Sequence, residues 1–185
     1  VEEIDVGVNG GNFGWDEREG SFFHEGAKTP DMIDPVAEYD HTNMVDDLPA
    51  GLTGGRAVTL GEVARGTGIP GLDGKLMLGD LSTGLIYYLD VDTDPLDGGQ
   101  DGLAELIMLD ADGNPVRLIE LINQTRNARG LGDSSRADLR FSVGMDGQVF
   151  VLNKHDGVVR QIVPEPASFV LLAAGGLAVM RRRRR

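Results

Sequence analysis

The chain of 185 residues contains no cysteine and few aromatic residues, which make up 5% of it. Without cysteine, disulfide bonds and thiolate metal sites are excluded. Cations are scarce as well: once the five arginines that end the chain are set aside, residues 1–180 hold 12 Lys and Arg against 30 Asp and Glu. A body with this net charge of −18 repels phosphate backbones, so nucleic-acid binding is not expected.

A long apolar run occurs near the C-terminus, at Ala167–Met180, and it carries no charge. As a helix it would span about 21 Å, against about 30 Å for the hydrocarbon core of a bilayer. Arginine side chains that reach the interface and local thinning of the bilayer close much of this gap. The run is followed by the cationic residues Arg181, Arg182, Arg183, Arg184 and Arg185.

Two other interpretations of this tail are weaker. A helix buried in the protein core is disfavoured because five adjacent charges could not all be paired there. A nucleic-acid or localisation patch is disfavoured because the arginines directly adjoin an apolar helix. We therefore predict a short C-terminal transmembrane helix with its arginines on the cytoplasmic side.

The tail resembles the PEP-CTERM sorting signal of bacteria. The resemblance rests on Val163–Ser168, which includes Pro164, Glu165 and Pro166, on the apolar run, and on the terminal arginines. It implies a transient anchor that an exosortase processes in the envelope of exopolysaccharide-producing Gram-negative bacteria. The implied location is the inner membrane, with the body in the periplasm and release to the cell surface or matrix after processing.

The first residues include no basic segment followed by an apolar run, as a secretory signal peptide would require. Since the tail predicts export, we expect the natural N-terminus to lie upstream of Val1. The two predicted parts of the chain are a body at 1–163 and a sorting segment at 164–185.

The body is predicted to be all-β, because short apolar runs alternate with turn signals. Four Asp-Gly pairs at 73–74, 112–113, 146–147 and 156–157 supply the positive φ of tight hairpins. The expected strands are Ile4–Val8, Arg56–Val63, Lys75–Leu78, Leu85–Asp90, Glu105–Leu109, Val116–Ile122, Leu139–Val143, Gln148–Leu152 and Val158–Val163. Hairpin units repeated radially would form propeller blades, whereas units closed on themselves would form a sandwich or barrel.

Several segments in order resemble the glucose/sorbosone dehydrogenase family of six-bladed β-propellers, which use pyrroloquinoline quinone (PQQ). They are Gly11–Trp15, Pro35–His41, Gly61–Lys75, Leu78–Ile86 and Asp138–Phe141. The resemblance implies the C-terminal part of such a propeller, with PQQ and calcium as cofactors of the full-length protein and the catalytic histidine on earlier blades.

The chain departs from this family at the positions that matter for chemistry. The family's lysine would fall within Leu81–Gly84, where this chain has Ser82, and its two arginines would fall near Ala137–Leu139, where Arg136 and Arg140 are out of register. No catalytic or PQQ-binding residue is therefore assigned. The predicted function is a PQQ-dependent aldose dehydrogenase-like protein. The alternative is a noncatalytic envelope or matrix propeller that binds carbohydrate, such as exopolysaccharide, or protein.

One candidate metal site comes from spacing. Asp90, Asp92, Asp94 and Asp101 occupy the first, third, fifth and twelfth places of a calcium loop. Pro95 replaces the glycine of such loops, and a solvated acidic loop is the competing interpretation.

Two further residues have open roles. His41 follows Asp40 and could act as a general base, but we favour a hydrogen bond that fixes its loop. Trp15 could stack on a sugar ring, but we favour a plug at the end of a blade.

Overall fold

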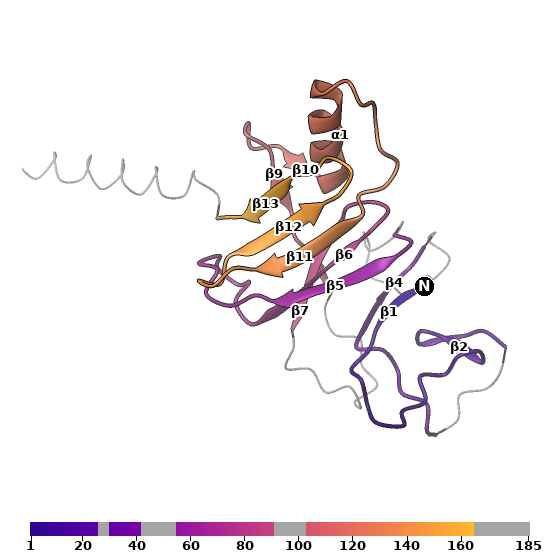
Figure 1. Cartoon of the computed structure of the whole chain (residues 1–185). Helices are drawn as coiled ribbons and strands as arrows, with labels where there is room; N and C mark the ends of the chain where they lie inside the picture. The colour runs from indigo at the N-terminus through magenta and orange to yellow at the C-terminus, as the bar shows by residue number, and fades with distance from the viewer. Residues whose placement is uncertain (26–29, 42–54, 91–102, 165–185) are drawn as a thin grey trace, which may run out of the picture.

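The computed structural model describes residues 1–25, 30–41, 55–90 and 103–164, which form several small antiparallel sheets and one helix (Figure 1). The central sheet has four strands in sequence order: β5 (Val58–Val63), β6 (Lys75–Asp80), β7 (Ile86–Asp90) and β8 (Ala104–Glu105). The outer sheet has three: β11 (Leu139–Val143), β12 (Val149–Asn153) and β13 (Val159–Ile162). The remaining pairs are β1 (Glu2–Ile4) with β4 (Ala37–Tyr39), β2 (Arg18–Glu19) with β3 (Phe22–Phe23), and β9 (Met108–Leu109) with β10 (Pro115–Val116).

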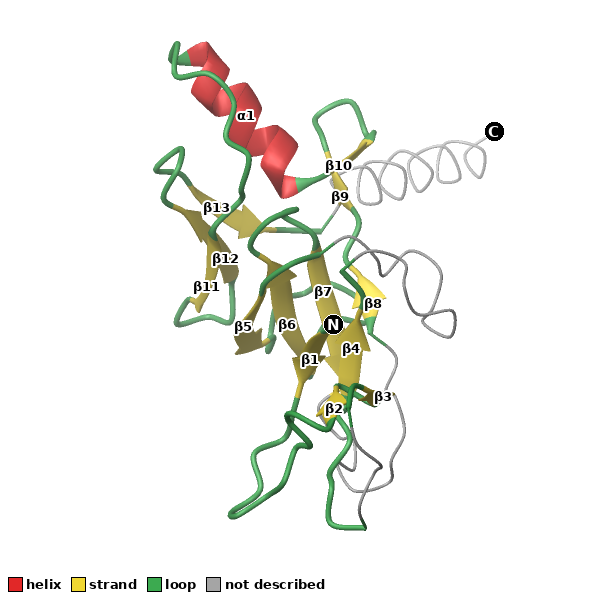
Figure 2. Ribbon diagram, turned by 90° about the vertical axis from the view of Figure 1, so that its right-hand side faces the viewer, coloured by secondary structure: helices red, strands yellow, loops and turns green. Residues whose placement is uncertain are grey.

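Successive residues of a strand point to opposite sides of a sheet. Both sides of the central sheet are covered, so the side chains on its two faces belong to two different cores. Leu78 and Tyr87 pack on one face with Tyr39 of β4, in a core that also holds Ile4 and Val36. On the other face, the residues of the central sheet and of the outer sheet share a second core. It includes Met77, Ile86, Leu139, Val149 and Val151. Figure 2 shows the resulting order of layers, with the β1–β4 pair and the outer sheet on opposite sides of the central sheet.

The helix α1 (Leu118–Ala128) corrects the prediction of a strand at Val116–Ile122. Leu118 and Ile122 are both buried, and their spacing of four places them on one face of a helix. At its start, the Arg117 backbone N–H donates to the Glu120 carboxylate at 2.7 Å, which satisfies one otherwise free donor. The helix continues beyond the expected strand to Ala128.

The other strand predictions agree with the structure to within a few residues, with two exceptions. The expected strand Glu105–Leu109 is divided between β8 and β9, which belong to different sheets, and the second exception is at the N-terminus. There β1 ends at Ile4, where the expected strand begins. All four predicted Asp-Gly turns have a glycine at positive φ: 84° at Gly74, 82° at Gly113, 83° at Gly147 and 66° at Gly157.

The all-β, propeller-plus-anchor prediction is confirmed only in its coarser part. The described residues are mostly β-sheet with one short helix, and in these ranges the sheets close into neither a barrel nor a propeller ring. No helix among them is long and apolar enough to cross a bilayer. The predicted membrane helix at Ala167–Met180 lies outside the described residues.

Candidate functional site

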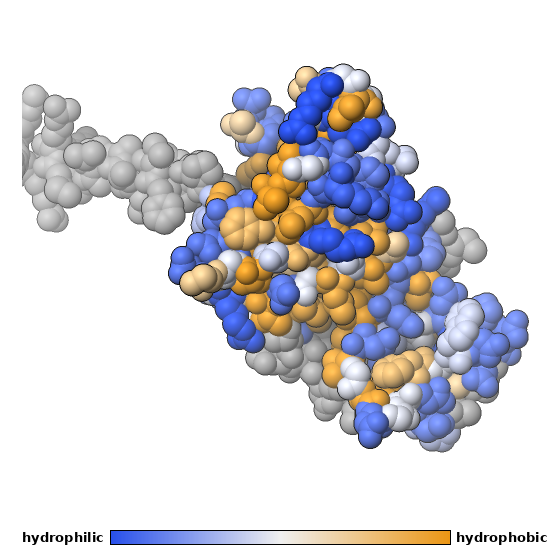
Figure 3. Space-filling view, viewed as in Figure 1, coloured by the Kyte–Doolittle hydropathy of each residue, from blue (hydrophilic) through white to orange (hydrophobic). Residues whose placement is uncertain are grey.

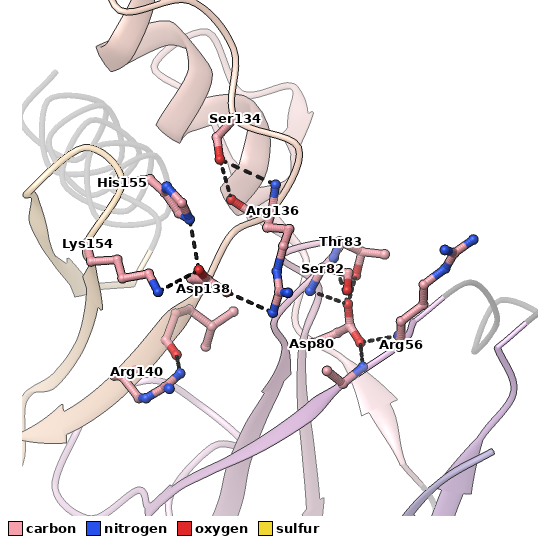
Figure 4. A network of polar contacts seen from close by, with 12 residues as sticks. Arg56, Asp80, Ser82, Thr83, Ser134, Arg136, Asp138, Arg140, Lys154 and His155 are labelled. Atoms are coloured by element: carbon pink, nitrogen blue, oxygen red, sulfur yellow. Dashed lines mark hydrogen bonds and ion pairs between the residues drawn. The ribbon is translucent and has the colours of Figure 1, made fainter.

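Two hairpin loops lie at one end of the central and outer sheets, on either side of the segment that leads into β11 (Figure 4). The first joins β6 to β7 and the second joins β12 to β13. The segment that leads into β11 lies against the first loop, because the backbone N–H groups of Ala137 and Asp138 both donate to the Leu81 carbonyl at 2.9 Å. Polar side chains from three segments are thereby gathered at this end.

Asp80 is the centre of the first loop and is fully buried. Its Oδ1 accepts hydrogen bonds from Ser82 N at 2.9 Å and from Thr83 N and Oγ1 at 2.6 and 2.9 Å. Its Oδ2 accepts from Arg56 N at 2.6 Å and from Ala57 N at 2.9 Å. Burial alone would raise the pKa of this carboxyl, but the backbone donors outweigh it and the pKa is lowered.

Tyr39 connects the first loop to the β1–β4 pair. Its hydroxyl donates to Asp80 Oδ2 at 3.1 Å, and its ring lies 5.2 Å from that of Tyr87. Burial and the negative charge of Asp80 raise the pKa of Tyr39 well above its usual value. Tyr39 therefore stays a neutral donor at every physiological pH, and this first carboxylate serves the fold.

The second loop repeats the hydrogen bonds of the first. Asn153 Oδ1 accepts from His155 N at 2.8 Å and from Asp156 N at 3.3 Å, as Asp80 does from Ser82 and Thr83. Asp156 Oδ1 then accepts from Val158 N at 3.0 Å, as Thr83 Oγ1 does from Leu85 N at 3.3 Å. Both loops end in a glycine at positive φ, Gly84 at 72° and Gly157 at 66°. We call this arrangement the shared loop pattern.

Asp138 gathers three cationic or titratable side chains at the second loop. Its Oδ2 lies 2.9 Å from Lys154 Nζ and 2.8 Å from His155 Nε2, and its Oδ1 lies 3.1 Å from Arg136 Nη2. Its own side chain is 12% exposed and its φ is +45°, in the left-handed region. The hydrogen bond from Lys154 is the main reason why its pKa falls to about 2, with His155 and Arg136 adding to the effect against a smaller contribution from burial. These four residues form the Asp138 cluster.

The Asp138 cluster has the chemistry of an anion-binding site. Arg136 and Lys154 bring two positive charges against one carboxylate, and both side chains are exposed. Their remaining donors can reach a carboxylate or phosphate of a ligand. Asp138 also holds the His155 ring in one orientation, as a carboxylate does beside a general base.

The two arginines near Ala137–Leu139 have different surroundings. Arg136 belongs to the Asp138 cluster, whereas Arg140 donates from Nη1 to its neighbour's carbonyl, Leu139 O, at 2.6 Å. Asp138, Lys154 and His155 were not predicted as site residues. The matching loops at 80–84 and 153–157, each with an Asp or Asn first and a glycine fifth, were the signal that could have found the last two.

Of the four aspartates of the predicted calcium loop, one lies among the described residues. Asp90 ends β7 and forms an ion pair with Lys75, while Asp92, Asp94 and Asp101 lie outside the described residues. Among the residues that are described, no three side chains of His, Asp or Glu are grouped to hold a metal ion. The calcium site stays a prediction.

His41 and Trp15 lie away from the two loops. His41 Nε2 is 2.7 Å from Glu2 Oε1, and Glu2 Oε2 accepts from Val58 N at 2.8 Å, so this contact ties the end of β4 to β1 and β5. Trp15 is 74% exposed and its ring stacks on His24 at 5.5 Å. The Trp15 ring is therefore not enclosed by the described residues, and its role as a plug at the end of a blade stays a prediction.

Comparison with known proteins identifies the tail. Residues 163–185 match the family model of the PEP-CTERM protein-sorting motif. The tail is a PEP-CTERM sorting signal. This motif marks an exported protein that is sorted by an exosortase-type enzyme in association with the membrane.

The match confirms the predicted PEP-CTERM sorting motif at the end of the chain, and the division into a body at 1–163 and a segment at 164–185 stays a prediction. No solved structure matches the chain. The resemblance of the body to sugar dehydrogenases, with its PQQ and calcium, receives no support from these comparisons and stays a prediction.

Proposed function

We propose that this chain is the C-terminal part of an exported β-propeller that is anchored in the inner membrane until an exosortase-type enzyme processes it. The observation that carries the proposal is the PEP-CTERM match at 163–185. The terminal arginines stay in the cytoplasm, because guanidinium groups resist translocation, and the acidic body lies in the periplasm. Processing then releases the body to the cell surface or the matrix.

Mass spectrometry of the protein from an exosortase-positive host and from its exosortase-deficient derivative tests this proposal. We expect the body without its terminal arginines in the first host and the intact tail in the second. A matched variant with Arg181–Arg185 replaced by glutamine should also escape processing. An identical intact mass in both hosts would refute it.

Topology is tested separately with a reporter that is active only in the cytoplasm, fused at Val1 of an export-competent version. We expect no signal from the reporter. A strong signal in the membrane fraction would show that the body lies in the cytoplasm, which contradicts the proposed topology.

For the chemistry of the body we propose a sugar dehydrogenase-like activity in the longer protein. Two observations favour it: consecutive antiparallel meanders pack face to face, as neighbouring blades do, and the Asp138 cluster suits an anionic ligand. PQQ carries carboxylates, so Arg136 and Lys154 could hold it by charge-assisted hydrogen bonds. When bound, PQQ supplies the acceptor for hydride from an aldose. The role of this chain's residues would be binding and orientation.

Dye reduction by the longer protein, supplied with PQQ, calcium and a panel of aldoses, tests the activity. Loss of reduction in Arg136→Gln with Lys154→Gln, but not in Arg65→Gln, would assign the cluster to the cofactor. No reduction with any aldose would overturn the enzyme proposal. Carbohydrate binding without turnover would instead favour a noncatalytic platform.

A further inference from the structure

Within the described residues, the outer sheet has no counterpart to the fourth strand of the central sheet. The shared loop pattern aligns Asp80 with Asn153, so β6 corresponds to β12 and β7 corresponds to β13. In the central sheet β8 pairs with the far edge of β7, through Tyr87 with Glu105 and Tyr88 with Ala104. Among the described residues, β13 has β12 as its partner and no strand on its other edge.

A groove adjoins the outer sheet on the face that carries Arg160 and Ile162. It has a volume of about 670 Å³ and lies between β13, the β9–β10 hairpin and the first turns of α1. Its lining is mostly apolar and includes Met108, Leu118, Leu121 and Ile162. On the face seen in Figure 3, apolar side chains gather over the middle of the molecule, where β11–β13 lie in Figure 1.

The outer edge of β13 presents backbone N–H and C=O groups that can pair with one more strand. Because Asn153 N donates to Val158 O at 3.1 Å, the alternation of an antiparallel ladder turns the N–H and C=O of Val159 and Gln161 away from β12. In the central sheet, Ile86 holds the place of Val159, and its carbonyl accepts from Leu106 N at 2.8 Å. The same alternation continued to Val163 makes three outward residues on this edge.

We propose that the open edge of β13 pairs with β13 of a second copy of this chain, antiparallel and with the two-fold axis at Gln161. In this register Val159 faces Val163 of the partner copy, and Gln161 faces its own counterpart. The two valines are 60% and 59% exposed, so each pair removes apolar surface from water. Arg160 faces Ile162 of the partner copy, so no like charges meet.

This self-complementarity selects the second copy as the occupant. A two-fold contact needs one patch that matches itself, and in this register exposed valines face each other and no like charges are opposed. The register also places Ile162 of the partner copy on the groove side of the sheet, since residues 160 and 162 share that face. Pro164 has no N–H, which ends the ladder and keeps the contact a closed pair.

Cysteine cross-linking of the full chain in detergent micelles tests the register, because the chain has no other cysteine. In Gln161→Cys the two sulfur-bearing residues would lie about 5.5 Å apart between Cα atoms, within the range of a disulfide. In Val159→Cys they would lie about 14 Å apart, outside that range. We expect at least about tenfold more disulfide dimer from Gln161→Cys than from Val159→Cys, and efficient linkage in a mixture of Val159→Cys with Val163→Cys.

The outcomes are distinct. A dimer held by the apolar tail alone would link positions 159 and 161 equally, and this result would overturn the proposal. So would the absence of any linkage from Gln161→Cys when its circular dichroism matches that of the parent protein.

A charge variant gives a second measurement without cysteines. Val159→Lys would set lysines beside the partner's edge and should shift the sedimenting species from dimer to monomer. Met145→Lys is the matched control, since Met145 is exposed in the β11–β12 turn, and it should leave the dimer unchanged. A dimer that survives Val159→Lys intact would contradict the pairing.

Discussion

The β6–β7 and β12–β13 loops have the same backbone hydrogen bonds, but their first side chains are used differently. Asp80 is a buried carboxylate that accepts from two loop residues, from two residues of the approach to β5 and from Tyr39. Asn153 is an amide whose Oδ1 serves its own loop, and its Nδ2 is buried without a hydrogen-bond partner among the described residues.

The second and third positions of the loops differ as well. Leu81 and Ser82 occupy them in the first loop, and Lys154 and His155 occupy them in the second. The shared loop pattern uses only the backbone N–H of the third position, so the side chains at both positions are free to vary. The β6–β7 loop thus connects three sheets, whereas the β12–β13 loop carries charged side chains on the surface.

The largest effect is expected when the first carboxylate is removed. Asp80→Ala leaves several buried donors without an acceptor, and we expect it to lower the free energy of unfolding by about 4 kcal/mol or more. Asn153→Ala removes fewer bonds and should cost about 1–2 kcal/mol. Urea denaturation followed by circular dichroism measures both. Equal losses of unfolding free energy would show that the two side chains contribute equally to stability.

A second comparison concerns the contact between the β11–β12 turn of the outer sheet and the β5–β6 connection of the central sheet. A Cβ added to Gly147 would lie 1.8 Å from the Arg65 carbonyl oxygen, while a Cβ added to Gly74 would meet nothing within 4 Å. Their φ values, 83° and 84°, are nearly the same, so Gly74→Ala isolates the backbone cost of about 1–2 kcal/mol. We expect Gly147→Ala to cost about 1–3 kcal/mol more in thermal or urea unfolding. Equal losses of unfolding free energy in the two variants would mean that the β11–β12 turn can shift away from Arg65 without a measurable energetic cost.

The Asp138 cluster predicts an acid-sensitive contribution to stability. The pKa of this carboxyl is about 2 in the folded chain, against an ordinary value of 3.8. Its stabilising effect is therefore fully present above the ordinary value and is lost as the pH falls through about 2. Asp138→Asn should cost about 1 kcal/mol near neutral pH at low salt, since exposed ion pairs contribute little each.

Unfolding curves between pH 6 and 2 would check this prediction, with the parent losing more stability than Asp138→Asn on acidification. Parallel curves for the two proteins would show that the ion pairs contribute nothing to folding.

The smallest effect is expected from a graft between the loops. Replacing Lys154 by Leu and His155 by Ser copies the first loop into the second and keeps every backbone bond of the shared loop pattern. The free energy of unfolding should change by no more than about 1 kcal/mol. A loss as large as that from Asp80→Ala would show that the charged side chains hold the loop.

Local signals in the sequence predicted much of the fold. Strands with Asp-Gly turns, such as Leu139–Val143 and the hairpin that follows, could be placed because their apolar alternation and turn chemistry agree. The segment at Val116–Ile122 was misassigned because a short apolar run fits a strand or a buried helix equally well. The i, i+4 spacing of Leu118 and Ile122, with Glu120 three residues after Arg117, was the local sign of a helix.

The site could be predicted much less well, because its contacts join distant parts of the chain. Asp80 meets Tyr39 across 41 residues, and Asp138 meets His155 across 17. No spacing rule brings such residues together before the sheets are stacked. The sorting motif could be predicted from the sequence, since its proline, apolar and arginine parts follow one another along the chain and need no fold to be recognised.

The outer sheet and the sorting tail meet without a spacer. β13 ends at Ile162, and the PEP-CTERM match begins at Val163. An enzyme that grips the chain at Pro164 would therefore work within about 7 Å of a folded strand. Among the described residues β13 pairs only with β12, so in a single copy of the chain the proposed anchoring of the tail would pull first on a strand that is held from one side.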